Sequence, residues 1–281
     1  MARPRIGFMQ GRLSPPVDGK IQAFPWTHWR EEFAIARAAG FSLMEWTLDA
    51  ERLYENPVMT RAGRDEIARL KSRHALEIDS LTGDFFMQAP FHKAEGGERE
   101  GRVRDLREVC ASCAAAGITM LVIPLVDAGC IETPEQEADV QRTLGGMQAE
   151  LDELGLSIVF ESDFAPRALA RFIAQLGPAF GVNYDIGNSA SLGFDPMEEI
   201  NAYGARIRNV HVKDRVRGGT TVPLGTGNAD LAAVFRALGR ARYSGNYVLQ
   251  TARAVDGDHC GALVRYREMT ERWIAEAKHA A

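Results

Sequence analysis

Four strand-like apolar runs in the second half of the chain each end in a side chain that can bind a metal ion. A strand that is buried on both faces reads as a continuous apolar run, and a polar group at its end is costly unless something there uses it. The repeated pattern therefore predicts one polar cluster at one end of a barrel. The runs are SIVFE ending at Glu161, VNYD ending at Asp185, RNVH ending at His211 and NYVLQ ending at Gln250.

The donor atoms of this set are carboxylate oxygens, an imidazole nitrogen and an amide oxygen. They suit Mn²⁺, Co²⁺ or Mg²⁺ better than a structural zinc ion, which would draw on thiolates, although Zn²⁺ also accepts these donors. One such ion can hold a carbonyl and the adjacent hydroxyl of a sugar, and it stabilises the enediolate formed when the intervening carbon loses its proton. A nearby carboxylate then serves as the general base. A single glutamate or histidine also has structural explanations, such as a helix cap, and the matching positions of all four favour the metal site.

Other polar side chains near predicted strand ends are candidates for substrate contacts, because barrel enzymes place their chemistry at the C-terminal ends of the strands. The period of two along a strand puts Lys213 on the same face as His211. Glu45 and Asp84 have the alternative role of capping a loop. Arginine side chains near the last strand ends suit a phosphate or a carboxylate. The candidates are Gln10, Glu45, Asp84, Lys213, Arg215 and Arg253.

Apolar runs and helical segments alternate along the chain in eight strand-then-helix units. The expected strands are 5–10, 42–46, 77–86 with its exit loop, 119–126, 157–161, 181–185, 206–212 and 246–250. The expected helices cover 28–39, 60–73, 99–116 and 134–154, begin after Pro166 and Pro196, cover 230–238, and finally run to the C-terminus.

Strands that alternate with helices pair in parallel, and eight such units favour one closed (β/α)8 TIM barrel, an α/β fold, over an open sheet. No linker or composition shift divides residues 1–281, which predicts a single domain. An open dinucleotide-binding sheet would place G-x-G-x-x-G after the first strand. MQGRLSPP stands there instead, and the later LGTGNAD lacks the third glycine.

Composition limits the classes of partner. The net charge of −5 and the pI near 5.8 argue against a nucleic-acid binder, which needs a basic face. No apolar run approaches the roughly 20 residues that span a bilayer, and the strand-like start leaves no room for a signal peptide. Four cysteines make no disulfide framework, and Cys110 and Cys113 read as one face of a helix. These features predict a cytoplasmic protein with no membrane partner.

The chain resembles the xylose-isomerase-like TIM-barrel superfamily, and specifically its sugar phosphate isomerase/epimerase branch. The resemblance covers nearly the whole chain and rests on IGFMQGRL, AAGFSLMEW, FES, YDIGN, VHVKDR and LQTAR. It implies a sugar or sugar phosphate as the small-molecule substrate, one bound Mn²⁺ or Co²⁺, and a homo-oligomer. The implied metal ligands are Glu161, Asp185, His211 and Gln250, with Glu161 and Gln250 also as the catalytic pair.

This sequence departs from the family pattern at two positions. Gln250 stands where the family has a glutamate that acts as the second base, and an amide can bind a metal ion but cannot accept the proton. Asn188 stands where the family has a histidine, and it is a further candidate for a hydrogen bond to a sugar hydroxyl.

The alternatives to an isomerase or epimerase are an inosose-type dehydratase, which is a lyase on the same metal site, and a non-catalytic sugar-binding barrel. The abasic-site endonuclease branch of the superfamily uses a histidine-rich cluster of three zinc ions. Only one of the six histidines lies at a predicted strand end, which argues against that branch.

Overall fold

The computed structural model describes residues 5–279, and its centre is a closed barrel of eight parallel strands in the order β1 to β8. The barrel closes where β1 pairs with β8, from Ile6 against Tyr247 to Phe8 against Leu249. This arrangement confirms the predicted (β/α)8 fold. The strands are β1 (Ile6–Met9), β2 (Leu43–Thr47), β3 (Glu77–Thr82), β4 (Met120–Leu125), β5 (Ser157–Ser162), β6 (Phe180–Asp185), β7 (Ile207–Val212) and β8 (Asn246–Leu249).

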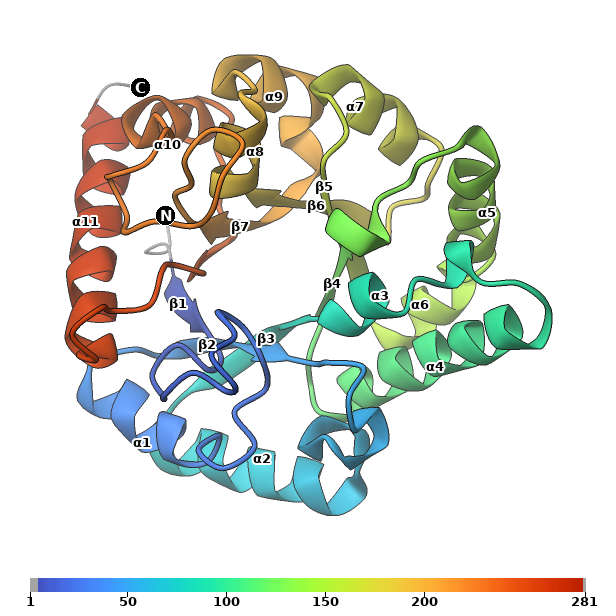
Figure 1. Ribbon diagram of the computed structural model, residues 1–281, viewed down its shortest axis with the longest axis horizontal. Helices are drawn as coiled ribbons and strands as arrows, with labels where there is room; N and C mark the ends of the chain where they lie inside the picture. Colours follow the sequence, from blue (N-terminus) through green and yellow to red (C-terminus); the bar gives the residue numbers. More distant parts are fainter. Residues whose placement is uncertain (1–4, 280–281) are drawn as a thin grey trace.

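Helices surround the barrel and follow the strands along the chain (Figure 1). Among the outer helices, α2, α5, α9 and α10 begin with a side-chain cap, as where the Thr60 side chain accepts the backbone N–H of Gly63 at the start of α2. The helices are α1 (Glu31–Ala38), α2 (Arg61–His74), α3 (Asp84–Gln88), α4 (Gly96–Ala115), α5 (Pro134–Gly145), α6 (Gln148–Leu154), α7 (Pro166–Ala174), α8 (Ile186–Leu192), α9 (Pro196–Tyr203), α10 (Leu231–Arg240) and α11 (His259–His279). Among these, none is both long and apolar enough to cross a bilayer.

The helices differ from the sequence prediction in three places. The expected helix over 134–154 is broken into α5 and α6 around Gly145 and Gly146, because glycine is a poor helix former. The expected exit loop of the third strand contains the short helix α3, and α8 follows β6 directly. The last helix was expected to reach the C-terminus; α11 extends to residue 279, and residues 280–281 lie outside the described part.

The strand register stacks polar side chains inside the C-terminal half of the barrel. Asp185 of β6 is the register partner of His211 of β7, and two residues earlier Asn183 is the partner of Asn209. Because side chains two residues apart share a face, all four point into the barrel. All four are also buried, so the barrel interior contains two successive polar layers beneath its C-terminal mouth.

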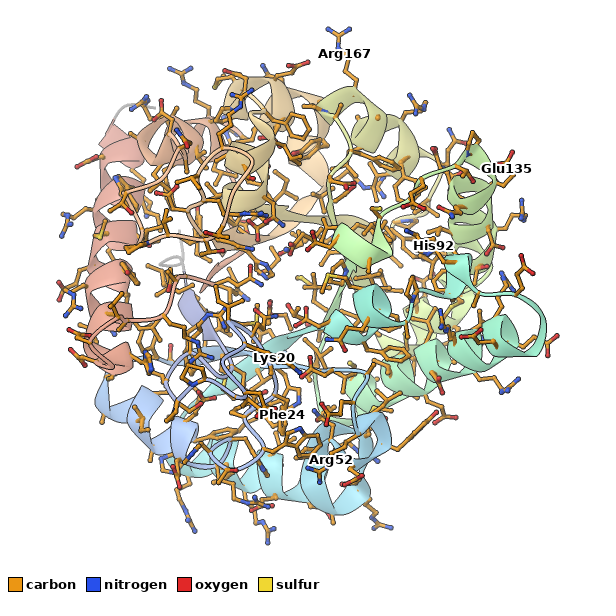
Figure 2. The ribbon with its side chains drawn as sticks, viewed as in Figure 1. Lys20, Phe24, Arg52, His92, Glu135 and Arg167 are labelled. Atoms are coloured by element: carbon orange, nitrogen blue, oxygen red, sulfur yellow. The ribbon has the colours of Figure 1, made fainter. Side chains whose placement is uncertain are left out.

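The segment 11–30 between β1 and α1 folds toward the barrel end, and two arginines hold it there. Arg12 donates to the backbone oxygen of Thr251 at 3.0 Å and to that of Ile21 at 2.6 Å. Arg253 donates to the oxygens of Ile21 at 3.1 Å and Ser14 at 2.7 Å. Lys20 and Phe24 of this segment lie within the ring of helices, whereas Arg167 projects outward (Figure 2).

Glu32 of α1 anchors the base of the same segment. Its carboxylate accepts the backbone N–H groups of Gly11 at 2.8 Å and Leu13 at 3.0 Å, and the Ser14 hydroxyl at 3.0 Å. Burial raises the pKa of Glu32 to about 6, although these hydrogen bonds oppose the rise. The segment is therefore fixed at both ends rather than free in solvent.

Candidate metal centre

Three of the four predicted metal ligands meet at the C-terminal end of the barrel. One ligand atom from each of Glu161, Asp185 and His211 lies within 4.8 Å of the other two. Nδ1 of His211 is 3.2 Å from Oε2 of Glu161 and 3.8 Å from Oδ2 of Asp185. All three side chains are buried, with exposed fractions of 5% or less. Two buried carboxylates converging on one imidazole nitrogen fit a single divalent cation, which would balance their charge.

Glu45 determines which nitrogen of His211 faces this group. Its carboxylate lies 2.7 Å from Nε2 of His211, accepts Nδ2 of Asn209 at 2.8 Å, and accepts the hydroxyls of Ser80 and Thr82. A histidine that gives one N–H to a carboxylate presents its other nitrogen to a metal ion. Nδ1 is therefore the candidate ligand atom.

The pKa values of this pair follow from the same contacts. Burial alone would raise the pKa of Glu45, but the charge of His211 and the hydrogen bonds outweigh it and lower that pKa. Burial likewise opposes a charge on His211, but Glu45, Asp185 and Glu161 together raise its pKa well above the ordinary value. In the metal-free protein, the protonated imidazole of His211 thus supplies the positive charge among these carboxylates. An ion that binds Nδ1 must displace the proton on that nitrogen.

The placement of Glu45 favours a positioning role over the expected substrate contact. Its side chain is fully buried, and its two oxygens accept four donors. No lone pair is left to face a ligand in the barrel mouth.

Glu45→Gln is expected to weaken Mn²⁺ binding about 10- to 100-fold while the barrel stays folded, because the amide no longer holds the His211 ring as a carboxylate does. Calorimetric titration of metal-free protein with Mn²⁺ measures the change. Ser80→Ala is the matched control, since it removes one donor to Glu45 but leaves the histidine contact. Equal Mn²⁺ affinity in Glu45→Gln and native protein would contradict the positioning role.

Lys213 joins Gln250 to the three predicted ligands. Its Nζ donates to Oδ2 of Asp185 at 3.3 Å, to Oδ1 of Asn188 at 3.2 Å and to Oε1 of Gln250 at 3.2 Å. Lys213 thus points into the mouth with His211, as the strand period predicts. Gly187 makes room for it, because a Cβ there would lie 2.6 Å from the lysine Cγ.

Asn183 and Asn209, which the sequence analysis missed, form the polar layer that lies deeper in the barrel than Asp185 and His211. Nδ2 of Asn183 lies 3.2 Å from Oε2 of Glu161 and 3.0 Å from Nδ1 of His211, and its Oδ1 accepts Nδ2 of Asn209 at 2.9 Å. Their position two residues before Asp185 and His211, on the same strand face, is a signal that the sequence contains. Asn188, which was expected to contact substrate, donates to Oε1 of Glu161.

The remaining candidates take varied places. Gln10 is fully buried and accepts the backbone N–H of Thr47 at 3.0 Å. Its side chain therefore lies between strand ends and not among the candidate metal ligands. Arg215 donates to the Gly219 oxygen at 2.7 Å and to Oδ1 of Asn188 at 2.8 Å. Arg253 is engaged by the backbone of the 11–30 segment.

Asp84, at the start of α3, accepts a hydrogen bond from Gln22. The sequence analysis did not single out Gln22. Nε2 of Gln22 donates to Oδ2 of Asp84 at 2.6 Å. Burial, and then the charge of Asp49, raise the pKa of Asp84 to about 7.

The raised pKa of Asp84 predicts that Asp84→Asn increases the free energy of unfolding in a pH-dependent way. Between pH ~4 and ~7 the folded chain keeps a proton that the unfolded chain gives up, so native stability falls as pH rises through this window. The asparagine variant carries no such proton. Its free energy of unfolding is expected to match that of the native protein near pH ~4 and to exceed it by a few kcal/mol above pH ~8. Urea denaturation of metal-free proteins at several pH values tests this, and a pH-independent difference would contradict it.

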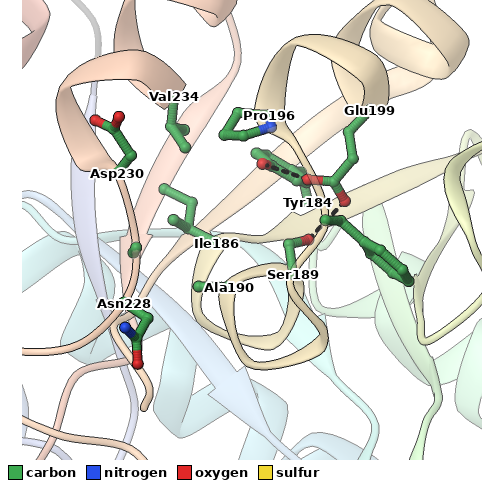
Figure 3. A pocket seen from close by; sticks show the side chains of 11 residues that line it. Tyr184, Ile186, Ser189, Ala190, Pro196, Glu199, Asn228, Asp230 and Val234 are labelled. Atoms are coloured by element: carbon green, nitrogen blue, oxygen red, sulfur yellow. Dashed lines mark hydrogen bonds between the residues drawn. The ribbon is translucent and has the colours of Figure 1, made fainter. Parts of the chain in front are cut away.

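A pocket of about 70 Å³ lies between α8, α9 and the start of α10 (Figure 3). In its wall, Glu199 accepts the hydroxyls of Tyr184 at 2.9 Å, Ser189 at 2.7 Å and Tyr203 at 2.7 Å. Burial raises the pKa of Glu199. Through these three hydroxyls the carboxylate braces α8, whose first turn carries Asn188.

Comparisons with known proteins agree with this architecture. The chain is 24% identical over 270 residues to a putative L-ribulose-5-phosphate 3-epimerase of Escherichia coli strain K12, covering 89% of this chain and 92% of the relative. A solved L-ribulose 3-epimerase superposes with a TM-score of 0.76 at 18% identity, covering 99% of this chain and 97% of that one. A D-allulose 3-epimerase from Methylomonas sp. gives 0.76 at 17% identity, with 96% and 98% covered. Residues 33–274 match the xylose isomerase-like TIM barrel family, and the chain belongs to that family.

Proposed function

We propose that this protein is an isomerase or epimerase of a sugar or sugar phosphate, which uses one divalent ion held by Glu161, Asp185, His211 and Gln250. The observation that carries the proposal is the convergence of the first three on one small buried volume at the barrel mouth. The relatives named as sugar epimerases support the substrate class. When bound, the ion supplies Lewis-acid stabilisation of the negative charge that develops on two adjacent sugar oxygens.

Glu161 is the proposed general base, because the ammonium of Lys213 pairs with Asp185, the other carboxylate of the group. Asn188 donates to one oxygen of Glu161 and Asn183 to the other, which also lies 3.2 Å from Nδ1 of His211. We propose that Glu161 takes the proton from the carbon next to the carbonyl and delivers it, on the same face, to the former carbonyl carbon.

Gln250 limits which reaction is proposed. An amide cannot accept a proton, so a two-base transfer between the faces of the sugar cannot use it as the second base. An aldose–ketose isomerisation needs only one base for the carbon-bound proton, which Glu161 removes and returns on one face, while the hydroxyl proton passes to the former carbonyl oxygen. The same residue supports the second candidate, a barrel that binds a sugar without turning it over.

The test is incubation of Mn²⁺- or Co²⁺-loaded protein with ketoses and ketose phosphates in D₂O. The proposed function expects a product of the same composition in which solvent deuterium has entered next to the carbonyl. A product lighter by one water would instead identify a dehydratase. Sugar binding with neither a rearranged product nor deuterium uptake in any of the sugars would overturn the proposal in favour of the binding barrel.

A further inference from the structure

A continuous chain of side-chain hydrogen bonds crosses the barrel mouth from Asp84 to Lys213. Nε2 of Gln22 donates to Asp84 at 2.6 Å, and Oε1 of Gln22 accepts Nε2 of Gln250 at 3.0 Å. Oε1 of Gln250 in turn accepts Nζ of Lys213 at 3.2 Å. The two amides thus lie in series between a carboxylate at one end and an ammonium at the other.

The end groups fix the direction of both amides. Lys213 has only donors, so Gln250 must turn its oxygen toward it. Arg12 also has only donors, and its Nη2 lies 3.1 Å from Oε1 of Gln22. With that oxygen facing Arg12 and Gln250, the Gln22 NH₂ group faces Asp84, and the Gln250 NH₂ group has an acceptor in the Gln22 oxygen.

The direction matters because the two ends of an amide differ in sign. An oxygen turned toward the candidate metal centre is a ligand, whereas an NH₂ group in the same place would point positive hydrogens at a cation. A glutamate at this position would present oxygen in either orientation and would need no such control. Lys213, which marks the side on which the Gln250 oxygen lies, also bonds Asp185 of the centre.

We propose that Gln22 is a positioning residue that holds the Gln250 amide with its oxygen turned toward the metal centre, through the hydrogen bond that it accepts from Gln250. The proposal rests on the proposed metal site. It assigns to the 11–30 segment a part in metal binding, although none of its side chains is itself a ligand. Arg12 and Asp84 act one step further out, by holding Gln22 in the required direction.

The test is a double-mutant cycle of Gln22→Met and Gln250→Glu, read as the Mn²⁺ dissociation constant by calorimetry. In the native background, Gln22→Met is expected to weaken Mn²⁺ binding about fivefold, the equivalent of one ordinary hydrogen bond. In the Gln250→Glu background, the same substitution is expected to change the affinity by less than about twofold, because either carboxylate oxygen faces the ion. Asp84→Ala, which removes the acceptor of the Gln22 NH₂ group, is a second variant with the same expected dependence on the background.

Each other outcome overturns the inference. An equal loss of affinity in both backgrounds would mean that Gln22 only supports the local fold, and no loss in the native background would mean that it does not orient Gln250. Absence of Mn²⁺ binding in the native protein would refute the metal site itself and with it the role of Gln22. Native binding without coupling would refute the role of Gln22 alone.

Discussion

His211→Ala is expected to remove the bound divalent ion. The native protein, purified without chelators and supplied with Mn²⁺, should carry about one ion per chain, and the variant should carry none at equal metal concentration. The substitution deletes the nitrogen on which Glu161 and Asp185 converge. Loss of a residue that only hydrogen-bonds a ligand lowers metal affinity about 10- to 100-fold. Loss of the ligand itself should therefore lower the affinity by at least about 100-fold. Metal analysis of the desalted proteins measures the result.

The same change leaves Glu45 buried without its charged partner, so a fall in stability of about 3–5 kcal/mol is also expected. His92→Ala separates the two effects, because His92 is another buried histidine but lies far along the chain, beside α4. That control should keep its ion. An ion retained by folded His211→Ala protein would contradict the proposed ligand set.

Glu161→Gln is expected to lower the rate of deuterium exchange into substrate by about 10²- to 10⁴-fold at saturating Mn²⁺. The glutamine has nearly the same shape but cannot take the proton. Because Asn183 and Asn188 both donate to this side chain, the new NH₂ group also meets a donor, and metal affinity falls in parallel. For this reason the rate is measured at saturating metal, after titration of each protein.

Gln250→Glu is the matched control for the base, since it adds a carboxylate where Glu161→Gln removes one. It is expected to keep the exchange activity and to increase any epimerisation relative to isomerisation, because a second base becomes available on the other side of the substrate. Exchange at the native rate in Glu161→Gln would show that another group is the base.

Sequence reasoning was strongest for features that repeat. The barrel was predicted from eight apolar runs of similar spacing, and the candidate ligands from polar residues at matching ends of three of them. A wrong boundary in one unit therefore does not change the prediction. The helix over 134–154 was wrong because two adjacent glycines outweighed an otherwise continuous helical pattern. The short helices α3 and α8 escaped notice because segments of five and seven residues carry little periodicity.

Within the candidate site, the inner residues were accessible to sequence reasoning and the outer ones were not. Asn183 and Asn209 follow from the period of two, once the inward face of β6 and β7 is known. Glu45 was placed at the right strand end, but its depth depends on a register with β1 and β3 that no local pattern specifies. Gln22 reaches the site from an irregular segment whose path is set by Arg12 and Arg253, and no periodicity describes such a path.

The bonds that close the barrel have a consequence for the order in which the protein matures during synthesis. Arg12 and the Thr251 oxygen that it binds are 239 residues apart, and the partners of β1 in β8 are similarly distant. The seam cannot form until the last strand has left the ribosome, and neither can the bonds that join Thr251 and Arg253 to the 11–30 segment. A nascent chain that already contains Glu161, Asp185 and His211 therefore still lacks Gln250 and these bonds. Capture of the proposed ion in its final geometry would thus be a late, post-translational step, and a chain stalled before β8 would hold only an open, incomplete set of the proposed ligands.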